Sequence, residues 1–194
     1  LFRMSYYKNR INLEVFHALT DGNGALSFLK EITYQYIRLK HAELTGKVRD
    51  MLLSETSLDS EDSYISNYKK KEKKTYKTKR AVIIKGEKLS ANELAITHGM
   101  MSVQEIKKIA KAYGVTINQY LVGVYTWAIY KSYLKQKSSD RPITTCVPVN
   151  LRPYFESDTN KNFFVVVSAV FEPKENEYTF EQVLKITTDS LKEQ

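Results

Sequence analysis

The spacing of hydrophobic residues changes within the first part of the chain. Over residues 9–16 hydrophobic and polar side chains alternate, which is typical of a β-strand with one buried face. Over residues 25–39 the apolar positions recur at helical spacing, which predicts a helix. His17 has the parity of the buried strand positions, so a strand that continued to it would turn the imidazole inward. The pattern therefore predicts a strand, a tight glycine-containing loop and a helix, with His17 at the end of the strand.

Apolar stripes predict three further helices in the second half of the chain. Each begins with a Ser or Thr that is followed three residues later by Glu or Gln, the pattern of a capping box. These helices cover residues 102–114, 116–134 and 179–191, and Gly114 ends the first of them. The second helix is mostly apolar, and we expect it to be buried along Ile117, Tyr120, Leu121, Val124 and Ala128.

Short apolar runs predict strands around these helices. We expect two short strands at residues 81–84 and 94–98, and two longer ones within 142–155 and 162–171, joined by a polar loop. The longer runs are typical of central strands that are covered on both faces of a sheet. Cys146 lies in the first of them, and we interpret it as a buried, unreactive thiol. Together the elements predict an α/β fold, a mixed sheet with packed helices.

Composition divides the chain into three regions. Residues 54–80 are polar, serine-rich, acidic and then basic, and they predict a linker or long surface loop between residues 1–53 and residues 81–194. The chain begins at Leu1 and ends inside a helical pattern at Gln194. We therefore interpret it as a piece of a longer protein.

Positive charge is concentrated in one stretch of the predicted linker. The 194 residues carry a formal net charge of +8, and most of it comes from the basic run between Lys69 and Arg80. The near-neutral remainder argues against a domain that grips nucleic acid with a whole basic face, so no nucleic-acid partner is expected. The basic run is open to two interpretations, a solvated loop or a contact for phosphates or for the acidic surface of a partner.

Residue usage also limits the setting and the cofactors. No run of about eighteen apolar residues is present, so no membrane-spanning segment is expected. A single cysteine cannot form a disulfide within the chain, which fits a reducing compartment, and we expect a cytoplasmic protein. Three histidines and one cysteine without the spacing of metal ligands predict no metal site.

His17, Asp21 and Gly22 are the candidates for chemistry. Histidine is the side chain best suited to accept a proton at neutral pH. Asp21 lies four residues further on, where it could bond to the histidine or brace the loop through an arginine. Gly22 and Gly24 allow the backbone to turn where a side chain would clash. On spacing alone, a core histidine beside an Asp-Gly turn stays open as the alternative.

Three segments in a fixed order carry a resemblance. FHALTDG (residues 16–22) looks like an HHxxxDG motif, and MSVQEIKKIAKAYGVTINQYLVGVYTWAI (101–129) looks like a characteristic helix pair. VPVNLRPYF (147–155) followed by NFF (162–164) looks like a PVNLRP motif with its downstream Asn-Phe segment. The ordered set resembles the CoA-dependent acyltransferase superfamily, which includes chloramphenicol acetyltransferase-like enzymes and condensation domains, and it is most similar to the alcohol acetyltransferase branch.

The resemblance implies a fold, a reaction and residue roles. The fold would be part of a two-lobed chloramphenicol acetyltransferase-like structure, with residues 1–53 ending one lobe and residues 81–194 starting the next. His17 would be the general base, taking a proton from a hydroxyl or amine acceptor as that group attacks the thioester of acetyl-CoA or another acyl-CoA. Asp21 and Gly22 would support the loop, with Arg152 as the expected partner of Asp21 because a guanidinium binds a carboxylate bidentately.

The sequence also departs from the family pattern. Phe16 occupies the position of the first motif histidine, and the downstream DFGWG-type motif and the first part of the N-terminal lobe are absent. We therefore expect this fragment alone to be inactive. Two alternatives remain: a condensation-type domain that uses thioesters on a carrier protein, and a non-catalytic binding module. The PVNLRP-like segment favours the acyl-CoA enzyme over the carrier-dependent one.

Overall fold

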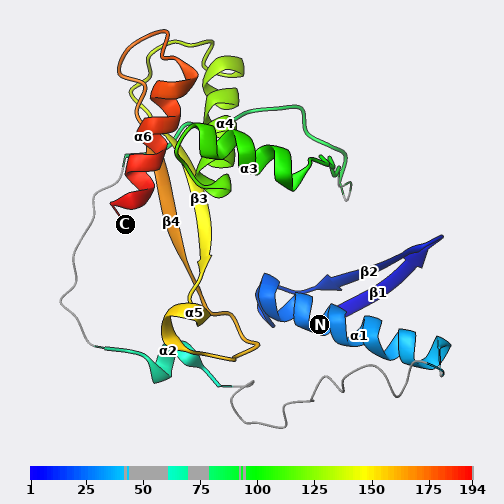
Figure 1. Cartoon of the computed structure of the whole chain (residues 1–194). Coiled ribbons are helices and arrows are strands. Elements are labelled where there is room, and N and C mark those ends of the chain that lie inside the picture. Colours follow the sequence, from blue (N-terminus) through cyan, green and yellow to red (C-terminus); the bar gives the residue numbers. More distant parts are fainter. Residues whose placement is uncertain (42, 44–60, 70–78, 92, 94, 194) are drawn as a thin grey trace. The chain divides into compact units, whose positions relative to one another are not determined.

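A computed structural model describes residues 1–41, 43, 61–69, 79–91, 93 and 95–193. The elements in chain order are β1 (Phe2–Tyr7), β2 (Arg10–Val15), α1 (Gly22–Lys40), α2 (Ser63–Ser66), α3 (Val103–Ala112), α4 (Ile117–Ser132), β3 (Ile143–Asn150), α5 (Arg152–Phe155), β4 (Phe164–Phe171) and α6 (Phe180–Lys192). β1 pairs with β2, and β3 pairs with β4 (Figure 1). The described part of the chain is thus mixed α/β, as predicted, but it contains two small antiparallel sheets instead of one mixed sheet.

The chain divides into two compact units. Unit 1 comprises Leu1–Lys73 and Pro148–Val165, and unit 2 comprises Lys74–Val147 and Val166–Gln194. The boundaries fall within β3 and β4, so the turn between these strands belongs to unit 1. The division predicted from composition, 1–53, 54–80 and 81–194, stays a prediction, and residues 54–60 and 70–78 of it lie outside the described residues.

Unit 1 begins with a hairpin and a helix. β1 and β2 are antiparallel, with Phe2 opposite Val15, and Lys8 turns the chain with a φ of 52°. β2 is the strand predicted from alternation. β1 was not predicted, although Phe2, Met4 and Tyr6 alternate with Arg3 and Ser5. α1 begins at Gly22, three residues before the predicted start, because Asp21 supplies the N-cap.

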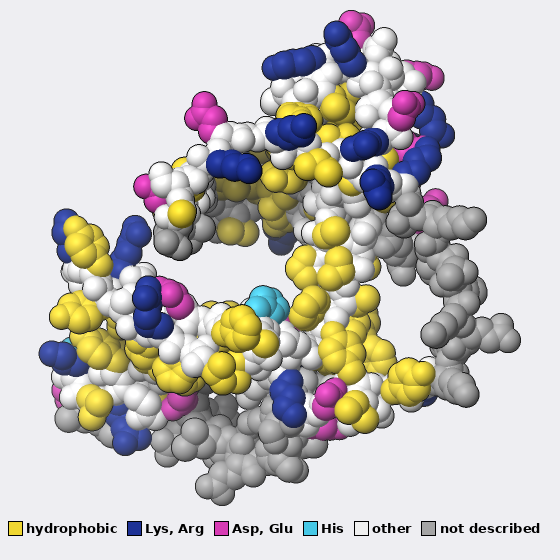
Figure 2. Space-filling view, turned by 180° about the vertical axis from the view of Figure 1, so that it is seen from behind, with side chains coloured by type: hydrophobic (Ala, Val, Ile, Leu, Met, Phe, Trp, Pro, Cys, Tyr) yellow, Lys and Arg dark blue, Asp and Glu magenta, His cyan; other side chains and the backbone are white. Residues whose placement is uncertain are grey.

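The hairpin and α1 bury very few of their hydrophobic side chains. Within residues 1–41 the buried positions are Asp21 and Gly24. Figure 2 shows hydrophobic side chains on the surface of this part of unit 1. Phe2, Tyr6 and Tyr7 are exposed hydrophobic residues of β1. Order in this part of unit 1 therefore depends on features other than an apolar core.

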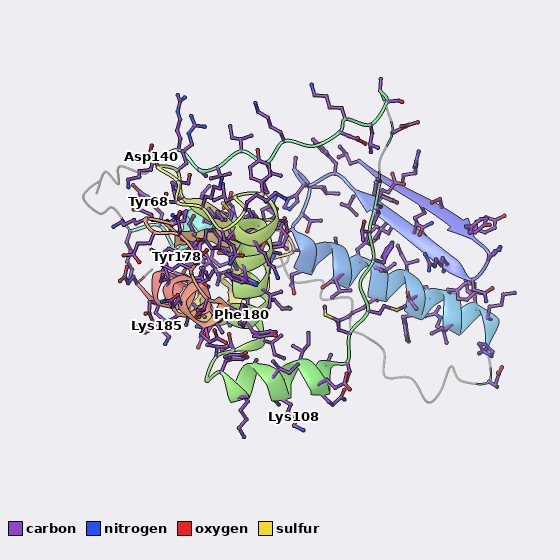
Figure 3. The ribbon with its side chains drawn as sticks, turned by 90° about the horizontal axis from the view of Figure 1, so that it is seen from above. Tyr68, Lys108, Asp140, Tyr178, Phe180 and Lys185 are labelled. Carbon is purple, nitrogen blue, oxygen red and sulfur yellow. The ribbon has the colours of Figure 1, made fainter. Side chains whose placement is uncertain are left out.

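Unit 2 has an apolar core of the ordinary kind. Tyr130, Ile143, Phe171 and Val183 form a buried cluster between α4, α6 and the β3–β4 pair. α4 and α6 lie side by side (Figure 1), and a Cβ at Gly123 of α4 would come within 2.5 Å of Leu184 Cδ1. Phe180, at the start of α6, is labelled in Figure 3, and its ring packs against the rings of Tyr113, Tyr120 and Trp127.

Local sequence signals explain the ends of the helices in unit 2. Thr116 and Thr179 open α4 and α6 with complete capping boxes, as predicted. Ser102 caps α3 by accepting from the amide of Glu105, although the reciprocal bond of a capping box is absent. Gly114, at φ 68°, ends α3 in the left-handed conformation that favours glycine, and so confirms the predicted stop.

The buried face of α4 differs from the predicted one. Its buried residues are Val122, Gly123, Thr126 and Tyr130, while Leu121 and Val124 are exposed. The prediction was wrong because the helix is apolar on most of its circumference, so periodicity could not select the face. The packing of α6 against Gly123 decides it.

Three further expectations about strands were wrong. Residues 81–84 and 95–98 form no strand, and Val82 makes a single backbone bond, to the carbonyl of Pro142; residue 94 lies outside the described residues. Because β3 and β4 therefore lack neighbouring strands among the described residues, they are not central strands. For the same reason Cys146 on β3 is exposed rather than buried.

Candidate functional site

A buried ion pair joins the two chain segments that make up unit 1. Asp21 and Arg152 are each 7% exposed, although 131 positions separate them in sequence. Arg152 Nη1 donates to Asp21 Oδ2 at 2.9 Å, and Nη2 donates to Oδ1 at 3.2 Å. The pairing predicted from the sequence is therefore present, in the bidentate geometry that gives a guanidinium and a carboxylate a fixed orientation.

All five donors of the Arg152 guanidinium are used. Besides the two bonds to Asp21, Nε donates to the carbonyl of Thr159 at 2.7 Å, Nη1 to Asn150 Oδ1 at 3.0 Å and Nη2 to the carbonyl of Lys161 at 2.6 Å. A buried guanidinium without such partners would lose its hydration uncompensated. Arg152 thus binds two backbone carbonyls of the loop after α5 as well as the carboxylate of Asp21.

The Asp21 carboxylate is equally well satisfied. It accepts from the amides of Asn23 and Gly24 at 3.1 Å, as the N-cap of α1, and from the amide of Phe163 at 2.9 Å. Burial raises the pKa of Asp21, but hydrogen bonds from Arg152 and from the amides of Phe163 and Gly24, together with the Arg152 charge, hold the pKa below its ordinary value of 3.8. Asp21 is therefore a structural carboxylate that stays ionised.

His17 lies in the turn between β2 and α1, on the surface. β2 ends at Val15, so the strand does not reach His17, and the imidazole is exposed. The inward orientation was predicted only for a strand that continues to His17, and this condition is not met. The alternative of a core histidine is excluded by the same exposure.

The His17 turn is held by a segment far away in sequence. Asn162 Nδ2 donates to the carbonyl of His17 at 3.0 Å, and the Phe164 ring packs against the imidazole with centroids 6.0 Å apart. Thr20 Oγ1 donates to the carbonyl of Asn160. The turn is thus attached to residues 160–164 at several points, while the imidazole itself faces outward.

The two glycines of the turn have different roles. A Cβ at Gly24 would come within 2.4 Å of the Asn160 carbonyl oxygen and 2.0 Å of Thr20 Oγ1, so only glycine fits there. A Cβ at Gly22 would meet nothing within 4 Å, and its φ is not positive. The expectation that Gly22 is needed for the turn was wrong, because Asp21 starts the helix directly at Gly22 without a left-handed residue.

The structure brings together most of the residues predicted for the site and adds others. His17, Asp21, Gly22 and Arg152 all lie in unit 1, around one turn. Sequence reasoning missed Thr159 and Tyr64, as well as the roles of Asn150 and Phe164. The NLRP and NFF segments contained a signal for Asn150 and Phe164, but the backbone carbonyls that surround Arg152 have no signature in a sequence.

The residues that the structure describes contain neither a membrane-spanning helix nor a metal-binding cluster. None of their helices is long and apolar enough to cross a membrane. No group of three or more His, Cys, Asp or Glu side chains in this part of the chain is arranged to hold a metal ion.

Comparisons of the chain with known proteins found no match, whether with models of protein families, with curated proteins or with solved structures.

Proposed function

We propose that this chain belongs to a CoA-dependent acyltransferase with a two-lobed chloramphenicol acetyltransferase-like fold. It would transfer an acetyl or other acyl group from a CoA thioester to a hydroxyl or amine acceptor, with His17 as the general base. The observation that carries the proposal is the buried bidentate pair of Asp21 and Arg152. This pair joins the FHALTDG segment to the VPVNLRPYF segment, as the resemblance of both segments implies.

The position of His17 supports the same proposal. Its backbone and ring are held by Asn162 and Phe164, which belong to the third family-like segment, NFF. Its imidazole is exposed and can therefore meet a substrate. A general base must be both fixed and accessible, and this turn provides the two properties together.

The proposed reaction is a direct transfer. His17 takes the proton from the acceptor hydroxyl or amine while the acceptor oxygen or nitrogen attacks the thioester carbonyl carbon. The tetrahedral intermediate then collapses, the C–S bond breaks, and the imidazolium returns the proton to the CoA thiolate. No hydroxyl or thiol among the described residues is hydrogen-bonded to the imidazole, so these residues supply no activated nucleophile for an acyl-enzyme.

The test uses a protein that contains these residues within the complete two-lobed fold, because the proposed active site lies between the lobes. The protein is incubated with acetyl-CoA and a panel of alcohols and amines, and free CoA thiol is followed. We expect acceptor-dependent thiol release that falls by about 10²-fold or more with His17→Ala.

His98→Ala is the matched control, since His98 is an exposed histidine of unit 2 and should leave the rate unchanged. If the folded protein releases no thiol with any acceptor, acyl-CoA is not its donor. Activity with a carrier-bound thioester would then identify a condensation-type enzyme, and inactivity with both donors would indicate a non-catalytic member.

A further inference from the structure

Three consecutive residues contact the His17 turn through three different groups. The Asn162 side chain donates to the His17 carbonyl, the Phe163 amide donates to Asp21 Oδ2, and the Phe164 ring packs against the His17 imidazole. The first contact holds the backbone of the turn at His17, and the second holds the side-chain carboxylate of Asp21. The third is the one that reaches the imidazole ring itself.

We propose that Phe164 is a positioning residue for His17, held in place by Tyr64, and that its ring sets the orientation of the imidazole. The functional part of this inference rests on the acyltransferase proposal. The structural part, the dependence of the imidazole orientation on Phe164 and Tyr64, can be tested without it.

Alternation along the chain aims Phe164 at His17. The neighbouring Phe163 is 1% exposed, and its ring packs edge-to-face against Tyr64 and Phe155 with centroids 5.1 and 5.7 Å away. Phe164 is the first residue of β4, and successive side chains of extended backbone point to opposite sides. The burial of Phe163 therefore directs Phe164 to the side on which His17 lies.

Tyr64 holds the backbone of Phe164 at both of its polar groups. The Tyr64 hydroxyl accepts from the Phe164 amide at 2.9 Å and donates to the Phe164 carbonyl. The side chain of Asp62 caps α2 at the amide of Tyr64, and the buried hydroxyl of Ser63 contacts the Ser157 hydroxyl at 2.7 Å. The contact between Ser63 and Ser157 thus attaches α2, and with it Tyr64, to the segment that follows α5.

The imidazole depends on this contact because other restraints are missing from the described residues. Neither ring nitrogen of His17 has a hydrogen-bond partner there, so the two side-chain torsions are limited only by packing. An edge-to-face contact with Phe164, at an interplanar angle of 64°, restricts both torsions. Loss of the ring should therefore release the imidazole without releasing the turn.

The experiment is NMR spectroscopy of the 194-residue chain with labelled His and Phe rings. We expect nuclear Overhauser contacts between the ring protons of His17 and Phe164. In Phe164→Leu the His17 ring resonances should shift toward those of a free histidine, while the amide resonance of Gly24, which reports on the Asp21 cap, stays in place. Phe164→Tyr keeps the ring and should keep the His17 resonances.

Two further variants separate positioning from general damage. Phe155→Leu is the matched control, because Phe155 contacts Phe163 but not His17, and it should leave the His17 resonances in place. Tyr64→Phe removes only the hydroxyl and should weaken the contacts between the two rings, so the inference stays testable if Phe164→Leu does not fold. Absence of these contacts in the wild type, or unchanged His17 resonances in Phe164→Leu, would overturn the inference.

The enzymatic consequence is read separately in the two-lobed protein. There Phe164→Leu should lower kcat about 10- to 100-fold with little change in KM, and Phe164→Tyr should restore it. If the NMR result is as expected but His17→Ala does not reduce turnover, the acyltransferase proposal fails and the positioning of His17 by Phe164 stands. If activity depends on His17 but the ring contacts are absent, the acyltransferase proposal stands and the positioning of His17 by Phe164 fails.

Discussion

The two units differ in the kinds of side chain that they bury, although unit 2 also buries Thr126, Thr187 and Thr188. Among the described residues, the buried side chains of unit 1 are Asp21, Ser63, Arg152, Thr159 and Phe163. The other nine hydrophobic side chains that are buried in the described structure all belong to unit 2. Unit 1 is therefore organised around charges and hydrogen bonds, and unit 2 around an aromatic and aliphatic core.

This difference between the units shows that the backbone around His17 is ordered by the ion pair and its hydrogen bonds. Apolar burial is non-directional and tolerates changes of shape, whereas a bidentate ion pair within a network of eight hydrogen bonds fixes angles as well as distances. Such a network is sensitive to single substitutions, because a buried charge that loses its partner lowers stability far more than a lost methyl group does. Unit 1 thus gains precision at the His17 turn and depends on very few residues for it.

The largest expected effect is loss of the ion pair. Arg152→Met leaves the Asp21 carboxylate buried without its partner, which should cost about 3–5 kcal/mol. Hydrogen exchange of the Gly24 and Phe163 amides, which donate to Asp21, should accelerate, while the amides of α4 and α6 keep their protection. Arg152→Lys keeps the charge but not the fork and should be intermediate or equally damaging. Unchanged exchange at Gly24 would contradict the assignment of unit 1 to a polar network.

The corresponding change in unit 2 acts through a cavity. Leu184→Ala removes a side chain that is 3% exposed, and it should lower the free energy of unfolding by about 2–5 kcal/mol. The fluorescence of Trp127, the one tryptophan of the chain, reports unfolding of this unit in urea. The Gly24 amide should be unaffected. Faster exchange of the Gly24 amide in Leu184→Ala would show that the stability of unit 1 depends on the core of unit 2.

A matched pair of glycine substitutions tests the turn itself. Gly24→Ala forces a Cβ against the Asn160 carbonyl, and overpacking of this kind costs about 1–3 kcal/mol. Gly22→Ala meets open space at the first helical position and should change stability by no more than about 0.5 kcal/mol. Urea denaturation of the two variants measures the difference. Equal destabilisation would mean that the close approach to Asn160 is not what requires glycine.

The smallest effect is expected from pH. Because the pKa of Asp21 is lower in the folded than in the unfolded state, its contribution to stability is complete above the ordinary value of 3.8 and is lost as pH falls through the folded-state pKa. Urea midpoints measured from about pH 5 to about pH 3 should fall less steeply in Asp21→Asn than in the wild type. Glu172, whose pKa is also lowered through its hydrogen bond from Lys79, titrates in both proteins and cancels in the comparison. Parallel pH profiles would show that Asp21 is not coupled to folding.

Local signals in the sequence predicted the elements better than their packing. The predicted strand at residues 9–16 is present as β2, and the four predicted helices are present as α1, α3, α4 and α6. Alternation, helical spacing and Ser or Thr caps act within a few residues, so the sequence alone reveals them. The strands at 81–84 and 94–98 failed, because an apolar run becomes a strand only where another strand offers its hydrogen bonds. The prediction of the buried face of α4 was wrong for a similar reason, since packing against α6 selects that face.

The candidate site shows the same limit. A pairing of Asp21 with Arg152 could be expected because a conspicuous motif supplied each partner. The contacts of Tyr64 with Phe164, and of Asn162 with the His17 carbonyl, involve ordinary residues 100 or more positions apart and could not be expected. Backbone carbonyls also complete the shell around Arg152, and a carbonyl is present at every residue of any sequence.

The sequence by itself determined the longer helices, the caps that begin α4 and α6, and the presence of a histidine, an aspartate and an arginine that could form one site. Only the tertiary structure decided that β2 stops at Val15, that His17 consequently faces outward, and that Gly24 rather than Gly22 must be glycine. Spacing along a chain records local geometry, whereas exposure and close approach depend on what distant residues bring to the same place.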